Sequence, residues 1–205
     1  MVRSLLLFFL LLQPAGLFSR LRGYDLFRLA LVLQFFRWQS TALTTMVTLY
    51  QERSPMLLPV PFGIDPERYR FIEIFLYGPY GMVIMTGIAY LVWVRGEAHA
   101  TIRPMTFRKT WELIGLCFFA PWVPSLLLDA LLVKMGLGGP AIIIPWHVTI
   151  LAIEVVLTSV GLNAVFGIPL PRAVWLGGVA GGGLSGLCGF ADSLITARRF
   201  PCSFK

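Results

Sequence analysis

Long apolar runs, separated by short and mostly basic connections, dominate this chain. A run of about twenty apolar residues is long enough to cross a lipid bilayer as a helix. Apolar residues make up 57% of the sequence and charged residues only 13%, whereas soluble domains carry about 25% charged residues. We therefore predict an all-α fold, a polytopic membrane helix bundle that passes through the lipid bilayer several times.

About five transmembrane helices fit the apolar runs. We place them near residues 29–50, 74–94, 113–133, 142–166 and 173–191, which together form a membrane domain over 29–191. A polar, basic tail over 192–205 follows this domain. Residues 1–28 form an N-terminal segment that precedes it.

The apolar stretch 5–18 within the N-terminal segment is too short to span comfortably. We expect Pro14 and Gly16 to break it just before the basic residues Arg20, Arg22 and Arg28. This pattern favours an uncleaved, short interfacial helix on the cytoplasmic side, with a cleaved signal peptide as the alternative.

The net charge of +7 reflects topology, and we expect no nucleic-acid partner. The bases cluster in short loops that flank apolar runs, as the positive-inside rule requires. We therefore assign the connection 95–111 to the cytoplasm and the connections 51–71 and 134–140 to the outer face. The tail would then lie outside despite its bases, so either the first helices set the orientation or the last segment does not fully cross. We favour a full crossing.

Four ionisable residues interrupt the apolar runs and form a candidate intramembrane polar network: Arg37, Asp129, His147 and Glu154. His147 and Glu154 are seven residues apart, so they share one helix face. We predict that Arg37 pairs with Glu154, because an isolated charge deep in the bilayer is costly. His147 and Asp129 can pair near the outer interface, although a neutral histidine bonded to water or a carbonyl is an open alternative.

Prolines and glycines mark special positions in the later spans. Pro121 and Pro124 should bend the third span, either lining a cavity or hinge or merely improving packing. The last span has two small-residue stripes at four-residue spacing, which permit close helix packing. The first is Gly178, Gly182 and Gly186, and the second is Gly177, Gly181, Ser185 and Gly189. The packing partner is either this chain or a second copy in a homo-oligomer.

Motifs for catalysis or metal binding are missing from the sequence. Cys117, Cys188 and Cys202 lie far apart without CxxC spacing, so we predict no metal site and no redox motif. Neither HExxH nor GxSxG occurs, and His99 and His147 are the only histidines. We therefore expect no enzyme and no cofactor.

Several stretches resemble the bacterial branch of the Yip-domain family, whose eukaryotic members are Rab-interacting membrane proteins. The resemblance covers residues 12–190 and lies in "QPAGLFSRLR", "IEIFLYGPYG", "MTFRKTWELIGLCFFAPWVPSLLLD" and "PWHVTILAIEVVLTSVGLNAVFGIPLPRAVWLGG". It includes an "F+xT" motif at Phe107, Arg108 and Thr110. It also includes a "GLxxVxGIxxxxA" motif that runs from Gly161 to Ala173.

The resemblance implies a five-helix membrane domain in the cell (inner) membrane. Eukaryotic members engage Rab-type GTPases in vesicle transport, whereas bacterial members have no generally assigned activity. Fewer than thirty residues precede the first predicted span, so the long polar N-terminal region of the eukaryotic members is not seen and GTPase binding is not expected. We expect a membrane-organising or partner-binding role, with a small transporter or channel component as the alternative.

Overall fold

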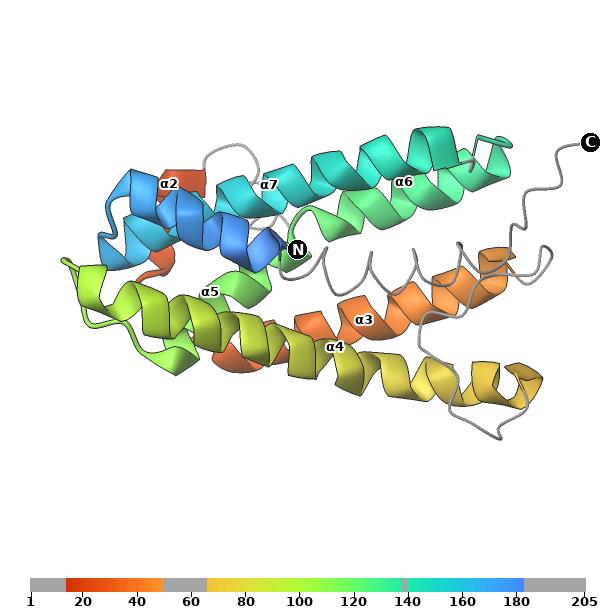
Figure 1. Cartoon of the computed structure of the whole chain (residues 1–205), viewed down its shortest axis with the longest axis horizontal. Coiled ribbons are helices and arrows are strands. Elements are labelled where there is room, and N and C mark those ends of the chain that lie inside the picture. Colours follow the sequence, from red (N-terminus) through yellow and green to blue (C-terminus); the bar gives the residue numbers. More distant parts are fainter. Residues whose placement is uncertain (1–13, 50–65, 138–139, 183–205) are drawn as a thin grey trace, which may run out of the picture.

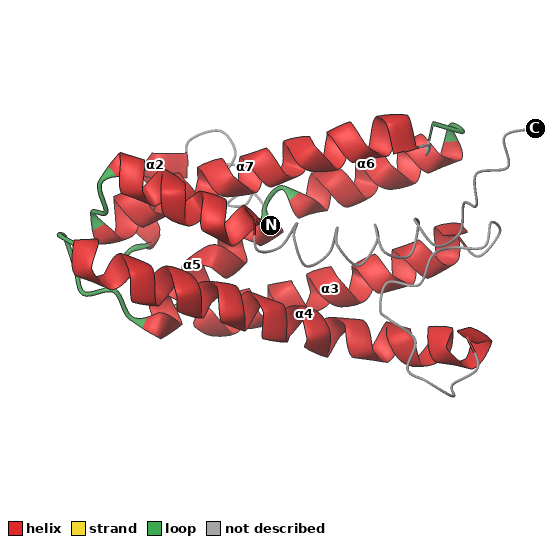
Figure 2. Cartoon of the chain, in the orientation of Figure 1, coloured by secondary structure: helices red, strands yellow, loops and turns green. Residues whose placement is uncertain are grey.

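The computed structural model describes residues 14–49, 66–137 and 140–182, and within these ranges the chain is helical with no strand. Its helices are α2 (Pro14–Leu21), α3 (Phe27–Leu49), α4 (Pro66–Gly96), the short 3-10 helix η1 (Glu97–His99), α5 (Phe107–Phe119), α6 (Trp122–Lys134) and α7 (Pro140–Phe166). A further helix covers 170–182. Figure 1 shows the long helices running side by side along one axis, and Figure 2 shows loops only at their ends and at the α5–α6 break.

Helix α5 is the centre of the bundle. Ten consecutive residues, from Thr110 to Phe119, are buried, and α5 contacts α3, α4 and α7. Ten consecutive residues point to every side of a helix, so this run of buried positions means that other elements surround α5. Thr106 begins this helix, because its side chain accepts a hydrogen bond from the amide of Lys109 at 3.3 Å.

Three segments are long and apolar enough to cross a membrane: Phe75–His99, Phe107–Leu132 and Pro145–Phe166. They correspond to the second, third and fourth predicted spans. Helix α3 is not one of them, although it has 23 residues, because glutamine, serine, threonine and arginine side chains dilute its apolar content. The chain has the helices of a membrane protein, and the count of five crossings stays a prediction.

Several helix boundaries differ from the predicted spans. Helix α4 begins at Pro66, eight residues before the predicted span, because charged residues extend the helix beyond its apolar part, which begins at Phe75. The third span is two helices, α5 and α6, separated at Ala120 and Pro121. Gly16 lies inside α2, so it does not break that helix, and Pro14 occupies the first position, where a missing amide costs nothing.

Helix α2 packs on the rest of the molecule instead of standing apart. It contacts α7, and its Phe18 is only 1% exposed within the hydrophobic core. Burying a phenylalanine side chain contributes about 1.5–3 kcal/mol. Packing against α7 therefore holds α2 in place, while residues 1–13 lie outside the described part of the chain.

Three loops meet at one end of the bundle, on the left in Figure 1. The amides of Thr101 and Ile102 both donate to the carbonyl of Phe166 at 3.0 Å. The guanidinium of Arg22 donates to the carbonyl of Ala164, and that of Arg103 donates to the carbonyl of Arg22 at 2.7 Å. The loops before α3, before α5 and after α7 are thereby joined, and we call this region the basic end.

Candidate functional site

Arg37 on α3 connects three helices inside the bundle. Its Nη2 lies 2.8 Å from Oε1 of Glu154 on α7, and its Nη1 donates to the carbonyl of Phe118 on α5 at 2.5 Å. The side chains of Arg37 and Glu154 are only 13% and 4% exposed. The structure thus brings together the two residues expected to pair, in a place that is almost closed to solvent.

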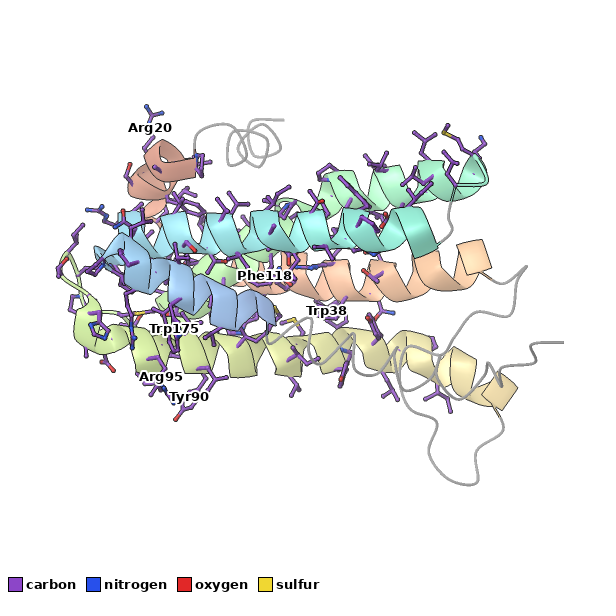
Figure 3. The ribbon with its side chains drawn as sticks, turned by 45° about the horizontal axis from the view of Figure 1, so that its top comes forward. Arg20, Trp38, Tyr90, Arg95, Phe118 and Trp175 are labelled. Carbon is purple, nitrogen blue, oxygen red and sulfur yellow. The ribbon has the colours of Figure 1, made fainter. Side chains whose placement is uncertain are left out.

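The carbonyl of Phe118 needs a donor because α5 ends at the next residue. The last carbonyl groups of a helix have no partner inside that helix, and the helical path is interrupted at Ala120 and Pro121. Arg37 therefore caps a helix as well as forming an ion pair. Its guanidinium also lies 5.7 Å from the ring centre of Phe118 and 5.8 Å from that of Trp38. Figure 3 shows Phe118 in the interior of the bundle.

Other polar side chains of α3 form hydrogen bonds with α5 and α6. Gln34 is fully buried and donates to the carbonyl of Gly115 at 2.5 Å. Thr41 donates to the carbonyl of Arg37 at 2.8 Å and accepts from the indole of Trp122 at 3.2 Å. Neither Gln34 nor Thr41 was among the residues predicted from the sequence. Their spacing from Arg37, three and four residues, marks one helix face and could have revealed them.

His147 and Asp129 form a second, separate pair. Nε2 of His147 lies 3.0 Å from Oδ2 of Asp129, and the two side chains are 54% and 26% exposed. The short turn between α6 and α7, which includes Gly136 with φ +74°, brings the two helices alongside each other. The four predicted polar residues therefore form two pairs rather than one network. Arg37 and Glu154 are buried inside the bundle, and His147 and Asp129 are more exposed, nearer the start of α7.

Pro121 and Pro124 differ in position. Pro121 lies in the break between α5 and α6, and Pro124 lies in the first turn of α6, where a proline removes no helical hydrogen bond. The predicted bend is thus a break at Pro121, and Pro124 does not kink a continuous helix. Arg37 fills the break, which fits packing better than a hinge.

The two neighbouring glycine stripes have different surroundings. A Cβ at Gly177 would lie 2.4 Å from Oγ of Ser159, and one at Gly181 would lie 2.5 Å from Cγ2 of Val155. Gly178 and Gly182 are exposed, with no atom of the described residues within 4 Å of their Cβ positions. Gly181 thus packs on α7, whereas no described residue packs on Gly178 or Gly182, and their role in helix packing stays a prediction.

Parts of the predicted site lie outside the described residues: Ser185, Gly186, Gly189, Cys188, Cys202 and the tail 192–205. Cys117 is free and buried. Within the described ranges, no group of three or more histidine, cysteine, aspartate or glutamate side chains could hold a metal ion.

The chain matches no family model, no curated protein and no solved structure. Membership of the Yip-domain family therefore stays a prediction from the residues quoted above.

Proposed function

We propose that this protein organises a membrane or binds a membrane partner, as a five-helix, Yip-type component of the inner cell membrane that turns over no substrate. The observation that supports this role is the Arg37–Glu154 pair. Both charges are buried and hydrogen-bonded across three helices, and a charge held in this way stabilises one arrangement of the bundle. A carrier would instead need its charged site to open to water.

The partner in this proposal is a helix of another membrane protein or of a second copy. Gly178 and Gly182 support it, because they leave a flat, exposed strip on the 170–182 helix. Where lipid is as apolar as leucine, such strips allow close backbone contact between helices. No GTPase contact and no nucleic-acid contact are part of the proposal.

Site-specific photo-crosslinking in native membranes tests this role. We expect a photoreactive residue in place of Gly178 to crosslink a membrane protein or a second copy, identified by mass spectrometry. The same residue in place of Leu176, a large and fully buried side chain of the same helix, is the matched control and should give no crosslink between chains. If neither position crosslinks in intact membranes, the proposed partner surface is wrong.

The second candidate function, ion or proton transport, is favoured by one observation. His147 and Glu154 share one face of α7, and His147 already contacts Asp129 at an exposed position, so a chain of ionisable groups runs inward from this end. Purified protein in liposomes, loaded with a pH-sensitive dye and given a pH step, distinguishes the two functions. Proton flux by the wild type that Glu154→Gln abolishes, with the variant still folded in the liposomes, would establish transport and contradict the scaffold role.

A further inference from the structure

A hollow of about 360 Å³ opens at the basic end of the molecule. Six charged side chains line it: Arg22, Asp25, Arg103, Arg108, Lys109 and Glu112. Its volume falls within the range of small-molecule sites, about 300–1,000 Å³. Four cations face two carboxylates, so the wall carries a surplus of two positive charges.

The two carboxylates already have cationic partners. Asp25 pairs with Arg108, and Glu112, which is buried, pairs with Lys109. Lys109 also donates to the carbonyl of Tyr24 at 2.6 Å. The two charges within each pair cancel, so these pairs do not account for the surplus positive charge.

Arg22 and Arg103 supply the surplus. Each donates to a backbone carbonyl, of Ala164 and of Arg22 respectively, and neither has a carboxylate partner among the residues described. A guanidinium has five donors, so each retains donors for another acceptor. The loop contacts also hold Arg103 in position against Arg22. Two such guanidinium groups beside a hollow form a typical arrangement for binding a phosphate group.

The position of the hollow indicates the source of the phosphate. The first apolar segment ends at His99, the second begins at Phe107 and the third ends at Phe166, so all three meet the membrane surface at the basic end. Lipid headgroups lie at this level, and basic pockets between membrane helices bind anionic headgroups. Tyr24, which lines the hollow, is 64% exposed and offers an amphipathic ring at the same depth.

We propose that this hollow binds the phosphate group of an anionic membrane lipid, with Arg22 and Arg103 as its ligands. The phosphate accepts hydrogen bonds from both guanidinium groups and balances their charge. The site is independent of the Arg37–Glu154 pair and of the glycine strip, so the proposal does not rest on the proposed function.

Calorimetric titration of the full-length protein in a neutral detergent tests this site. The probes are dihexanoyl phosphatidylglycerol, sodium phosphate, and dihexanoyl phosphatidylcholine as the zwitterionic control. We expect saturable binding of phosphatidylglycerol, weakened about tenfold by Arg103→Gln, because charge-assisted hydrogen bonds of this kind are lost. Arg95→Gln is the matched control: Arg95 is exposed at the same end and points away from the bundle (Figure 3), and binding should be unchanged.

A second variant should strengthen lipid binding instead of weakening it. Asp25→Asn releases Arg108 from its exposed ion pair and should tighten phosphatidylglycerol binding, which keeps the test decisive even if Arg103→Gln does not fold. If sodium phosphate binds with the same response to both variants, the site is for free phosphate and not for lipid. Equal binding of phosphatidylcholine, no binding of any probe, or affinity that neither variant changes would overturn the proposal.

Discussion

At the scale of single residues, Arg37 shows how one side chain can serve two helices. It neutralises Glu154 on α7 and donates to the carbonyl of Phe118, where α5 ends. Either contact alone would leave donors of a buried guanidinium unused, and an unpaired buried polar group is expensive. The two contacts together make the arginine stable at this position.

A double-mutant cycle measures this coupling. Arg37→Met or Glu154→Gln alone should each lower the free energy of unfolding by about 3–5 kcal/mol, because each leaves the other group buried without its partner. The double variant should lose less than the sum of the two, by roughly 1–3 kcal/mol. Thermal melting in detergent gives all three values. Strictly additive losses would show that the two side chains do not interact in the protein.

Asp25 provides a pH-dependent contact outside the membrane-spanning segments. The amide of Phe27 donates to its carboxylate at 3.2 Å and lowers the pKa of Asp25 below its usual value, with Arg108 and Lys109 contributing. A lowered pKa means that the contact stabilises the fold above the ordinary aspartate pKa and is lost as the pH falls through the lowered value.

We therefore expect Asp25→Ala to reduce the melting temperature near neutral pH, and the difference from the wild type to disappear in acid. Asp25→Asn keeps an acceptor for the amide of Phe27 and should retain part of the stability. A difference between Asp25→Ala and the wild type that stays constant from neutral pH into acid would contradict this role of the charge.

At the scale of elements, glycines set how closely the helices approach. On α4, a Cβ at Gly81 would lie 2.0 Å from Cδ2 of Trp38, and Trp38 is 5% exposed. Its indole ring therefore lies directly on the backbone of α4 and also contacts the ring of Tyr77 at 5.5 Å. This pair of helices, α3 and α4, can pack so closely only because position 81 has no side chain.

A matched pair of alanine substitutions tests this contact. Gly81→Ala should cost about 1–3 kcal/mol of stability, because the indole must move within a packed core. Gly87→Ala, on the same helix, meets no atom of the described residues within 4 Å and should be neutral or stabilising by up to about 1 kcal/mol. Thermal melting of both variants measures these changes in stability. A larger loss for Gly87→Ala than for Gly81→Ala would contradict the packing of Trp38 on α4.

Some features could be predicted from the sequence because they depend on composition or depth. The apolar runs predicted the three crossing segments, and the depth of Arg37 and Glu154 predicted their contact. The two glycine stripes are equivalent in the sequence, and only the rotation of the 170–182 helix decides that Gly181 packs on α7 while Gly182 does not. The burial of α5 could not be predicted from hydropathy either, since lipid and a protein core are equally apolar.

At the scale of the whole molecule, the two ends of the bundle differ in charge. The described part of the basic end includes Arg20, Arg22, Arg28, Arg95, Arg103, Arg108, Lys109 and Arg172. The opposite end includes the glycine turn between α6 and α7, with Lys134, and the start of α4, with Arg68 and Arg70. Loops rich in arginine and lysine stay in the cytoplasm, so this asymmetry predicts an orientation.

Cysteine labelling from either side of the membrane tests the orientation. His99→Cys at the basic end should react only after the membrane is opened, and Leu137→Cys at the other end should react with an impermeant reagent from outside. Both positions are exposed, and Cys188→Ser and Cys202→Ser remove two competing thiols. Reversed labelling would show that the predicted orientation is wrong. Labelling of both positions from the same side would contradict the crossing of Phe107–Leu132.

The long separation between Arg37 and Glu154 has a consequence for biosynthesis. The two residues are 117 positions apart, which corresponds to roughly 6–23 s of translation at about 5–20 residues per second. During that interval α3 has left the ribosome with an arginine whose partner does not yet exist. Insertion of α3 into the bilayer is costly while this arginine has no partner. We therefore expect α3 to reach its final placement only after α7 has been made.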